Sequence, residues 1–376
     1  MIFELSTLSS VINHLNQFHD PRDPNKVKHP LPTILFISIC GIFSGAESWE
    51  DMVLWAETHQ EWLGKYVDID SGIPSYSTIR RLFTLIKPAY WGQLLHHTLL
   101  EHHPNKKVED HIPIDGKTLR GSKCAAKDVR AMQMVSALSV ENNIVLGEVK
   151  TDCKSNEITA IPLLLALLDL EGATISIDAM GCNEKIINNI LKGGANYVIG
   201  LKKNQPKLYA AVETYSLEQG TSLDNLIEDY FDDSHGRSVR RRYFAFDVTD
   251  EINSLGFSQM KTIIATETIS GSPYTDGVSA EWRYYITNHN KAQPKLAEYI
   301  RGHWAIESYH WLLDVHLNDD RDKKYEESAA ENFAKTKRFL LDLVKSKPPE
   351  GKKRSVRSNL KRVGWDLDYL LTLLFV

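Results

Sequence analysis

The sequence predicts a mixed α/β fold with a helical N-terminal domain, an α/β core and a strand-rich insertion inside that core. Residues 1–105 carry apolar side chains at helical spacing, and residues from 110 onward alternate between strand-like runs and helices. The chain has 376 residues, too many for one ordinary hydrophobic core. We therefore expect two or three domains.

Four helical segments are expected in residues 1–105: Leu5–Phe18, Leu31–Phe43, Trp49–Tyr66 and Ser77–Leu100. Ser75 or Ser77 follows a Gly-Pro turn and is placed to cap the last of them. Arg80 and Arg81 then lie in its first turns, where a DNA-reading helix needs them. The alternative is that both arginines are ordinary surface residues.

The core, residues 106–204 and 291–345, begins with strands and then alternates. The expected elements are strands 112–115, 132–140 and 144–151, helix 156–170, strand 174–178, helix 183–192 and strand 196–201. This βββαβαβ order suggests a core of the RNase H type, a mixed sheet with flanking helices. Residues 205–290 interrupt it with a polar helix and three further strands, and helix 296–315 resumes it.

Positive charge is concentrated locally although the net charge is only −5. Residues 335–362 hold eleven Lys and Arg against two acids, and a second cluster comprises Arg237, Arg240, Arg241 and Arg242. Such density neutralises phosphates and supports DNA binding. The basic C-terminal segment comprises residues 346–376. For residues 345–362 the alternative is a solvated, flexible tail.

Two acidic residues end core strands that are neighbours in an RNase H-type sheet. Asp115 ends the first strand and Asp178 ends the fourth. Carboxylates brought together in this way can bind Mg²⁺ or Mn²⁺, and two such ions promote in-line phosphoryl displacement. Alternatively, each aspartate caps a turn.

A third acid is expected from helix 296–315. His303, Glu307, His310 and Asp314 are spaced four, three and four residues apart, so they share one face of that helix. Glu307 is the central choice; alternatively it pairs with a neighbouring Arg or His.

Other metal sites are disfavoured by the residue pattern. Glu307-x-x-His310 matches half of a di-iron carboxylate motif, but no second copy is present. His96, His97, His102 and His103 lack partner cysteines or a paired carboxylate motif and are interpreted as surface histidines. The four cysteines form no C-x-x-C pair.

Several ordered motifs resemble the DDE transposases of the family that includes the H-repeat-associated proteins of Rhs elements. The motifs are Gly45-Ala-Glu-Ser-Trp-Glu-Asp51, Gly72-Ile-Pro-Ser75, Ile114-Asp-Gly-Lys-Thr-Leu-Arg120, Lys154-Ser-Asn-Glu-Ile-Thr-Ala-Ile-Pro162, Asp178-Ala-Met-Gly-Cys182, His235-Gly-Arg237 and His303-Trp-x-Ile-Glu307-x-x-His310-Trp-x-Leu-Asp-Val315. They span nearly the whole chain to about residue 335.

This resemblance implies an RNase H-like core whose catalytic triad corresponds to Asp115, Asp178 and Glu307. Related cut-and-paste transposases carry Arg four residues before the final Glu and Lys seven after it. Here those places hold His303 and Asp314. The expected phosphate contacts, in addition to the arginines at 80, 81 and 237–242, are Lys117, Arg120, Lys202, Lys203, Arg301 and His303.

The expected function is metal-dependent cleavage of insertion-sequence ends and strand transfer into target DNA. The expected partner is double-stranded DNA, and the protein is expected to be a homodimer in the DNA complex. One alternative is a catalytically idle DNA-binding remnant of a mobile element, and another is a nuclease without strand transfer. The longest apolar run is too short to span a membrane, and no signal peptide is recognisable, so a cytoplasmic location is expected.

Overall fold

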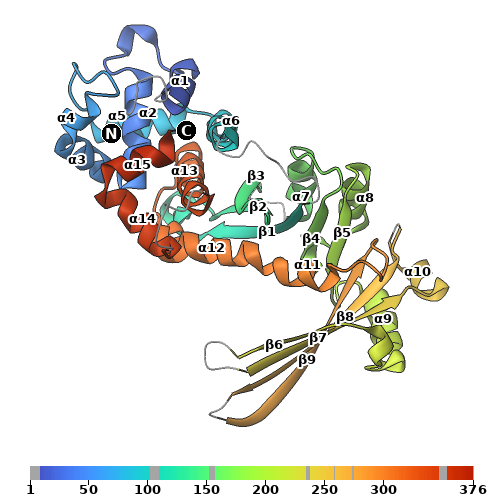
Figure 1. Cartoon of the computed structure of the whole chain (residues 1–376). Helices are drawn as coiled ribbons and strands as arrows, with labels where there is room; N and C mark the ends of the chain where they lie inside the picture. Colours follow the sequence, from blue (N-terminus) through green and yellow to red (C-terminus); the bar gives the residue numbers. More distant parts are fainter. Residues whose placement is uncertain are drawn as a thin grey trace.

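The computed structural model describes residues 9–101, 110–151, 157–233, 238–257, 259–272, 275–346 and 354–375. Its helices are α1 (Ser9–Gln17), α2 (Leu31–Phe43), α3 (Trp49–Thr58), α4 (Gln60–Leu63), α5 (Tyr76–Leu85), α6 (Pro88–Glu101), α7 (Glu157–Leu165), α8 (Glu184–Lys192), α9 (Pro206–Gln219), α10 (Asp250–Leu255), α11 (Leu296–Gly302), α12 (Trp304–Leu317), α13 (Glu327–Ser346), α14 (Val356–Trp365) and α15 (Leu367–Leu374). Its strands are β1 (His111–Leu119), β2 (Met132–Ser139), β3 (Ile144–Lys150), β4 (Thr174–Ile177), β5 (Asn196–Leu201), β6 (Leu226–Asp232), β7 (Ser238–Asp247), β8 (Thr262–Ser272) and β9 (Thr275–Thr287). Figure 1 shows an elongated molecule, with a helical body at one end and long hairpins at the other.

The N-terminal helices form where the apolar spacing predicted them. Helix α2 has the predicted bounds and is apolar on all sides, and all of its residues except Pro32 are buried. The predicted helix 77–100 is divided into α5 and α6, because Pro88 cannot continue a helix and restrains the residue before it. Ser75 caps α5 by accepting a hydrogen bond from the Thr78 backbone, as predicted.

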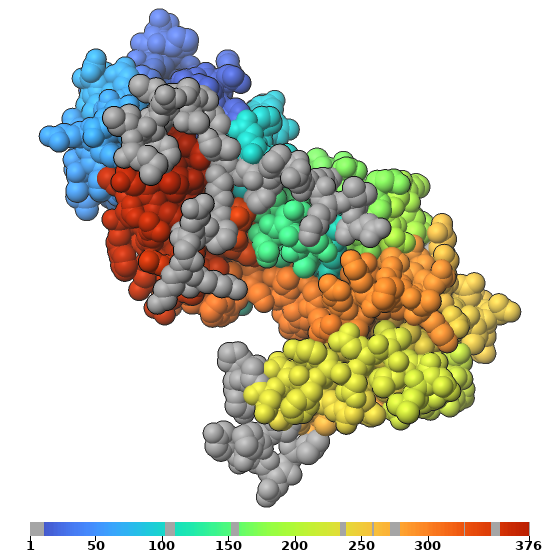
Figure 2. Space-filling model, in the orientation of Figure 1, coloured from blue at the N-terminus to red at the C-terminus, as the bar shows by residue number. Residues whose placement is uncertain are grey.

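The C-terminal helices α13, α14 and α15 complete the same helical body. Leu340, Val363 and Leu370 share one hydrophobic core with α2, α5 and α6. Figure 2 shows the C-terminal segment, in red, packed against the N-terminal helices, in blue. The alternative of a flexible, solvated tail is therefore wrong for residues 354–362, which lead into and form most of α14; residues 347–353 lie outside the described part. Over the described ranges, no helix has the length and apolar character to cross a membrane.

Within the described ranges, nine strands form one sheet in the order β3-β2-β1-β4-β5-β9-β8-β7-β6. Strands β1, β4 and β5 are parallel, and β2 and β3 continue the sheet as an antiparallel hairpin. The strands of the insertion extend this sheet, because β9 pairs antiparallel with β5. The mixed α/β class is confirmed, and the insertion is continuous with the core sheet.

Alternation along the central strands separates an apolar face from a polar one. Ile112 and Ile114 of β1, with Ile175 and Ile177 of β4, pack in the core that contains α7 and α8. Successive side chains of a strand point to opposite faces, so the residues between these isoleucines face α11 and α12. Asp115, the residue after Ile114, therefore points to the face that α11 and α12 cover.

Candidate active site

Asp115 and Asp178 lie side by side at one edge of the β1–β4 pair. The parallel register matches Ile114 with Ile177, so Asp115 and Asp178 are the next residues along the two chains. Asp178 directly follows β4, as predicted, but the prediction that Asp115 ends its strand is wrong, because β1 continues to Leu119 through its pairing with β2. Asp178 also caps the short turn Ala179–Gly181, accepting a hydrogen bond from the Met180 backbone at 2.9 Å. Asp178 thus caps a turn, as the alternative interpretation expected, and this hydrogen bond holds its carboxylate at the end of β4.

Helix α12 lies along β1 and turns its polar stripe toward the aspartates. His310 Nδ1 lies 3.4 Å from Asp115 Oδ2, and Lys117 Nζ lies 2.5 Å from Asp314 Oδ1. Glu307 is one helical turn before His310, on the same side. The structure therefore brings together Asp115, Asp178 and the α12 segment that carries Glu307.

The pKa values of two of these acids reflect their proximity. Burial opposes ionisation of Asp115, but the hydrogen bond and charge interaction with His310 outweigh it and lower the pKa. The pKa of Glu307 is raised, first by burial and then by the negative charge of Asp115, with a smaller contribution from Asp178. The three carboxylates thus share one electrostatic environment.

Asp178 and Glu307 line a cleft of about 410 Å³ between the sheet and α11–α12. Lys202 after β5, Arg283 of β9 and Trp304 of α12 also line it. The site therefore combines acidic groups with cationic side chains at the wall of one cleft. Carboxylates are the hard oxygen donors that Mg²⁺ prefers, so the chemistry of these three acids suits the expected cation. Their oxygens do not all lie within 4.8 Å of one another in the described part of the chain.

His303 lies in the cleft wall as part of a buried hydrogen-bond chain. Ser176 Oγ is 3.0 Å from His303 Nδ1 and 2.8 Å from His111 Nε2. Burial lowers the pKa of His303 and lowers that of His111 to about 3. A Cβ at Gly302 would lie 2.7 Å from His111 Nδ1, so this glycine permits the close approach of the α11–α12 junction to β1.

The residues expected to contact phosphate fall into two groups. Lys202, Lys203, Arg80, Arg81 and Arg120 are exposed. Arg120 and Arg80 nevertheless have acidic neighbours, Asp320 at 3.5 Å and Glu326 at 3.9 Å. Only Lys202 of this exposed group lines the cleft.

The second group is held in ion pairs within the protein. Lys117 is buried against Asp314, Arg301 pairs with Glu228, and Arg242 lies 2.5 Å from Glu267. These placements favour structural roles over the predicted phosphate contacts.

Two further arginines of the 237–242 cluster, Arg240 and Arg241, lie on β7. Arg240 Nη2 lies 2.6 Å from Asp229 of β6, and Arg241 is partly buried on β7. Arg237 lies outside the described residues. Paired acids on the neighbouring strands therefore account for much of the apparent positive charge of this cluster.

Sequence patterns gave no indication of Arg283. Its place beside Glu307 depends on the pairing of Leu201 with Tyr284 between β5 and β9, which joins segments far apart in the chain. Arg283 Nε lies 3.0 Å from Glu281, and its charge opposes the rise in the Glu307 pKa. Arg283 is thus a further cationic wall residue.

Comparison with known proteins gives matches over both parts of the chain. Residues 12–97 match the model described as DDE_Tnp_1-associated, and residues 106–341 match the model described as transposase DDE domain. "Putative transposase YncI" of Escherichia coli O157:H7 is 37% identical over 351 residues, covering 90% of this chain and 88% of the relative. "H repeat-associated putative transposase YhhI" of Escherichia coli K12 is 34% identical over 377 residues, covering 98% of each.

A shorter relative, "Inactive transposase YbfQ" of Escherichia coli K12, is 41% identical over 75 residues, which is 20% of this chain and 89% of the relative. The DDE model itself spans more than half of the chain and includes Asp115, Asp178 and Glu307. With the RNase H-like arrangement of the core, these matches show that the chain belongs to the DDE transposase family whose members include H repeat-associated transposases.

Proposed function

We propose that this DNA transposase cleaves the ends of its insertion sequence and joins the freed 3′ ends to target DNA, using Asp115, Asp178 and Glu307 as ligands of catalytic cations. The observation that carries the proposal is the parallel register that sets Asp115 beside Asp178. Helix α12 contributes Glu307 to the same electrostatic environment. Such a constellation is what phosphoryl transfer by carboxylate-bound cations requires.

Mg²⁺ or Mn²⁺, as two ions, would supply activation of the attacking oxygen and stabilisation of the leaving oxygen when bound. The protein's own side chains contribute positioning. His310 keeps Asp115 ionised and oriented, and the Lys117–Asp314 pair fixes α12 against β1. Lys202 and Arg283 at the cleft wall bind phosphate oxygens of the DNA strand.

Double-stranded DNA at the element ends and at the target is the proposed partner. We also propose that two copies assemble on the DNA, because both ends of an element must meet at one target. Light scattering measures the molecular mass of the protein–DNA complex and so tests this stoichiometry. A mass that corresponds to two protein copies supports the proposal, and a mass that corresponds to one protein copy on two paired ends contradicts it.

A strand-transfer assay tests the proposed activity and separates it from the two alternatives. Purified protein is incubated with Mg²⁺, target plasmid and either intact or pre-cleaved DNA carrying the inverted repeats that flank the gene. The protein is expected to cleave the intact DNA and to join the pre-cleaved DNA to the target plasmid. Cleavage without joining would identify a nuclease, and DNA binding without either product would identify an idle remnant.

A further inference from the structure

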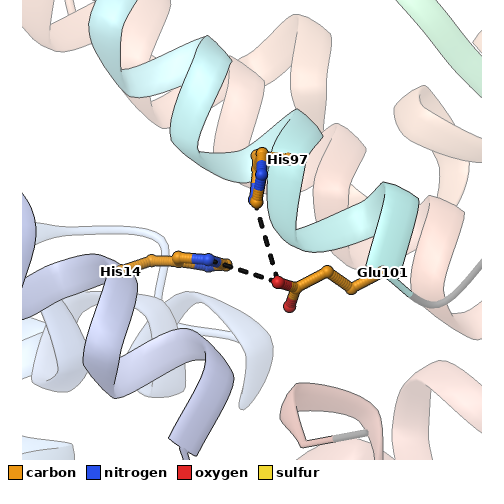
Figure 3. Close-up of side chains that lie close together, drawn as sticks. All are labelled: His14, His97 and Glu101. Atoms are coloured by element: carbon orange, nitrogen blue, oxygen red, sulfur yellow. Dashed lines mark ion pairs between the residues drawn. The ribbon is translucent and has the colours of Figure 1, made fainter.

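A second group of metal-ligating side chains lies in the helical body, away from the three acids. His14 comes from α1, and His97 and Glu101 lie one turn apart on α6 (Figure 3). One donor atom from each lies within 4.8 Å of the other two. His14 Nε2 is 3.3 Å and His97 Nδ1 is 3.9 Å from the same Glu101 oxygen, Oε1.

The hydrogen bonds of Thr98 determine which nitrogen of His14 carries a proton. The Thr98 hydroxyl donates to the Leu94 carbonyl at 2.9 Å, so its single proton is used there. His14 Nδ1, 3.1 Å from that hydroxyl oxygen, must therefore donate to it. The lone pair of neutral His14 Nε2 then faces a carboxylate oxygen, an arrangement that needs a cation between the two atoms.

That cation is either a proton on Nε2 or a metal ion, and a second nitrogen, from His97, would give a metal ion two imidazole ligands. A proton on His14 satisfies one imidazole–carboxylate contact, whereas His97 brings a second nitrogen to the same oxygen. In a tetrahedral zinc site with bonds of about 2.0–2.2 Å, donor atoms are about 3.4 Å apart. Small side-chain rotations would bring these three donors to that spacing.

We propose that His14, His97 and Glu101, the α1–α6 clamp, bind a first-row transition metal ion, with Zn²⁺ as the best-fitting ion. Neutral imidazole suits Zn²⁺ and disfavours Mg²⁺, so the clamp is chemically distinct from the three-carboxylate site. The contact from His14 Nδ1 to Thr98 is the outer hydrogen bond that orients a ligating histidine. A fourth position remains for water.

The clamp joins two helices that are far apart in sequence. It lies at the rim of a cavity of about 720 Å³ lined by His14 and His97, together with Tyr90, Leu94 and residues that precede α2. Metal bound to the folded state alone stabilises that state by mass action. Zn²⁺ would therefore fix α1 onto α6 and stabilise the helical body, independently of DNA cleavage.

Calorimetric titration with Zn²⁺ tests the clamp on the full chain after chelator treatment. Glu307→Gln protein in excess Mg²⁺ is used, so that the catalytic carboxylates compete poorly for Zn²⁺. One zinc-binding event is expected, and His97→Ala should weaken it by at least about 100-fold, more than loss of an outer hydrogen bond costs. His316→Ala, which removes an imidazole elsewhere on the surface, should leave it unchanged.

A second pair of measurements separates a built site from an ordinary ion pair. Thr98→Val should weaken zinc binding about 10- to 100-fold, because His14 loses the partner that orients it. Binding should also weaken in acidic buffer, since metal ligation requires deprotonated imidazole. Equal zinc affinity in the His97→Ala and unsubstituted proteins, with both folded by circular dichroism, would overturn the proposal and leave only a His14–Glu101 ion pair.

Discussion

Lys117 Nζ lies 2.5 Å from Asp314 Oδ1 and 3.5 Å from Asp320 Oδ1, at a position where the lysine side chain is almost fully buried. Asp314 is the only other α12 acid of the polar stripe within the described residues. Because its carboxylate is engaged by Lys117, it supports α12 on β1. Glu307 is left as the α12 acid that faces the cleft.

Asp314→Asn should therefore retain measurable cleavage, with a loss of about 10- to 100-fold through the altered position of α12. The amide still accepts a hydrogen bond from Lys117, and Asp320 still supplies a negative charge. Initial rates on element-end DNA give the measurement. A folded Asp314→Asn protein without activity, alongside normal cleavage by Glu307→Gln, would show that the catalytic acid is Asp314.

Lys202→Gln should weaken DNA binding and make it less dependent on salt. Lys202 is exposed and lines the cleft beside Asp178, and loss of one phosphate contact lowers the slope of log affinity against log salt by about 1. Fluorescence anisotropy over a salt series gives this slope. Lys207→Gln, an exposed lysine on α9, is the matched control, and the same slope for both variants would remove Lys202 from the DNA interface.

Arg338→Leu should destabilise the fold by about 3–5 kcal/mol, because removal of one buried charge leaves its partners uncompensated. Arg338 is 2% exposed, and it lies 2.6 Å from Glu148 and 3.3 Å from Asp319. Urea unfolding measures the effect, with the exposed Arg357→Leu as a control expected to change stability by less than about 0.5 kcal/mol. Equal stability of the two variants would contradict a structural role for this arginine.

His111 should make the protein lose stability in mild acid. Burial lowers its pKa to about 3 from 6.5, so its contribution is present above pH 6.5 and is lost as pH falls toward 3. Between pH 7 and 5.5 the loss from this group is about 1.3 kcal/mol. The difference in unfolding free energy between the unsubstituted protein and His111→Gln should shrink by that amount from pH 7 to pH 5.5. A difference that does not change with pH would contradict the lowered pKa of His111.

The central part of the fold was predictable because it depends on local patterns. Strand-like patterns predicted strands 132–140 and 144–151, which form the antiparallel hairpin of β2 and β3. Asn143, in the turn between them, adopts a positive φ of 58°. Strand β5 has the predicted bounds. The order of these elements was enough to set Asp115 beside Asp178.

Strand β6 was missed because its sequence, Leu-Ile-Glu-Asp-Tyr-Phe-Asp, has no regular alternation and is largely exposed. It is stabilised by the neighbouring strand, where Arg240 pairs with Asp229. The arginine cluster was interpreted as a DNA surface for the same reason, since its acidic partners come from other strands. Long-range pairing of this kind leaves no local sequence signal.

The basic C-terminal residues show the same limit. Lys337 and Arg338 lie in a dense positive run, yet both are buried and paired with acids outside that run, Asp322 and Glu148 respectively. His97 is exposed, as predicted, but the sequence did not show its neighbour in space, because His14 is far away along the chain. Charge counts along the chain therefore did not show which cations are available to DNA.

DNA cleavage by single-carboxylate variants is the most direct test of the proposed active site. Asp115→Asn, Asp178→Asn and Glu307→Gln are compared with the unsubstituted protein on element-end DNA in Mg²⁺ and in Mn²⁺. Each variant should bind that DNA and unfold at an unchanged temperature, yet show no cleavage, because a neutral amide is a poor ligand for a hard cation. Cleavage at the normal rate by any one of the three would contradict its place in the catalytic triad.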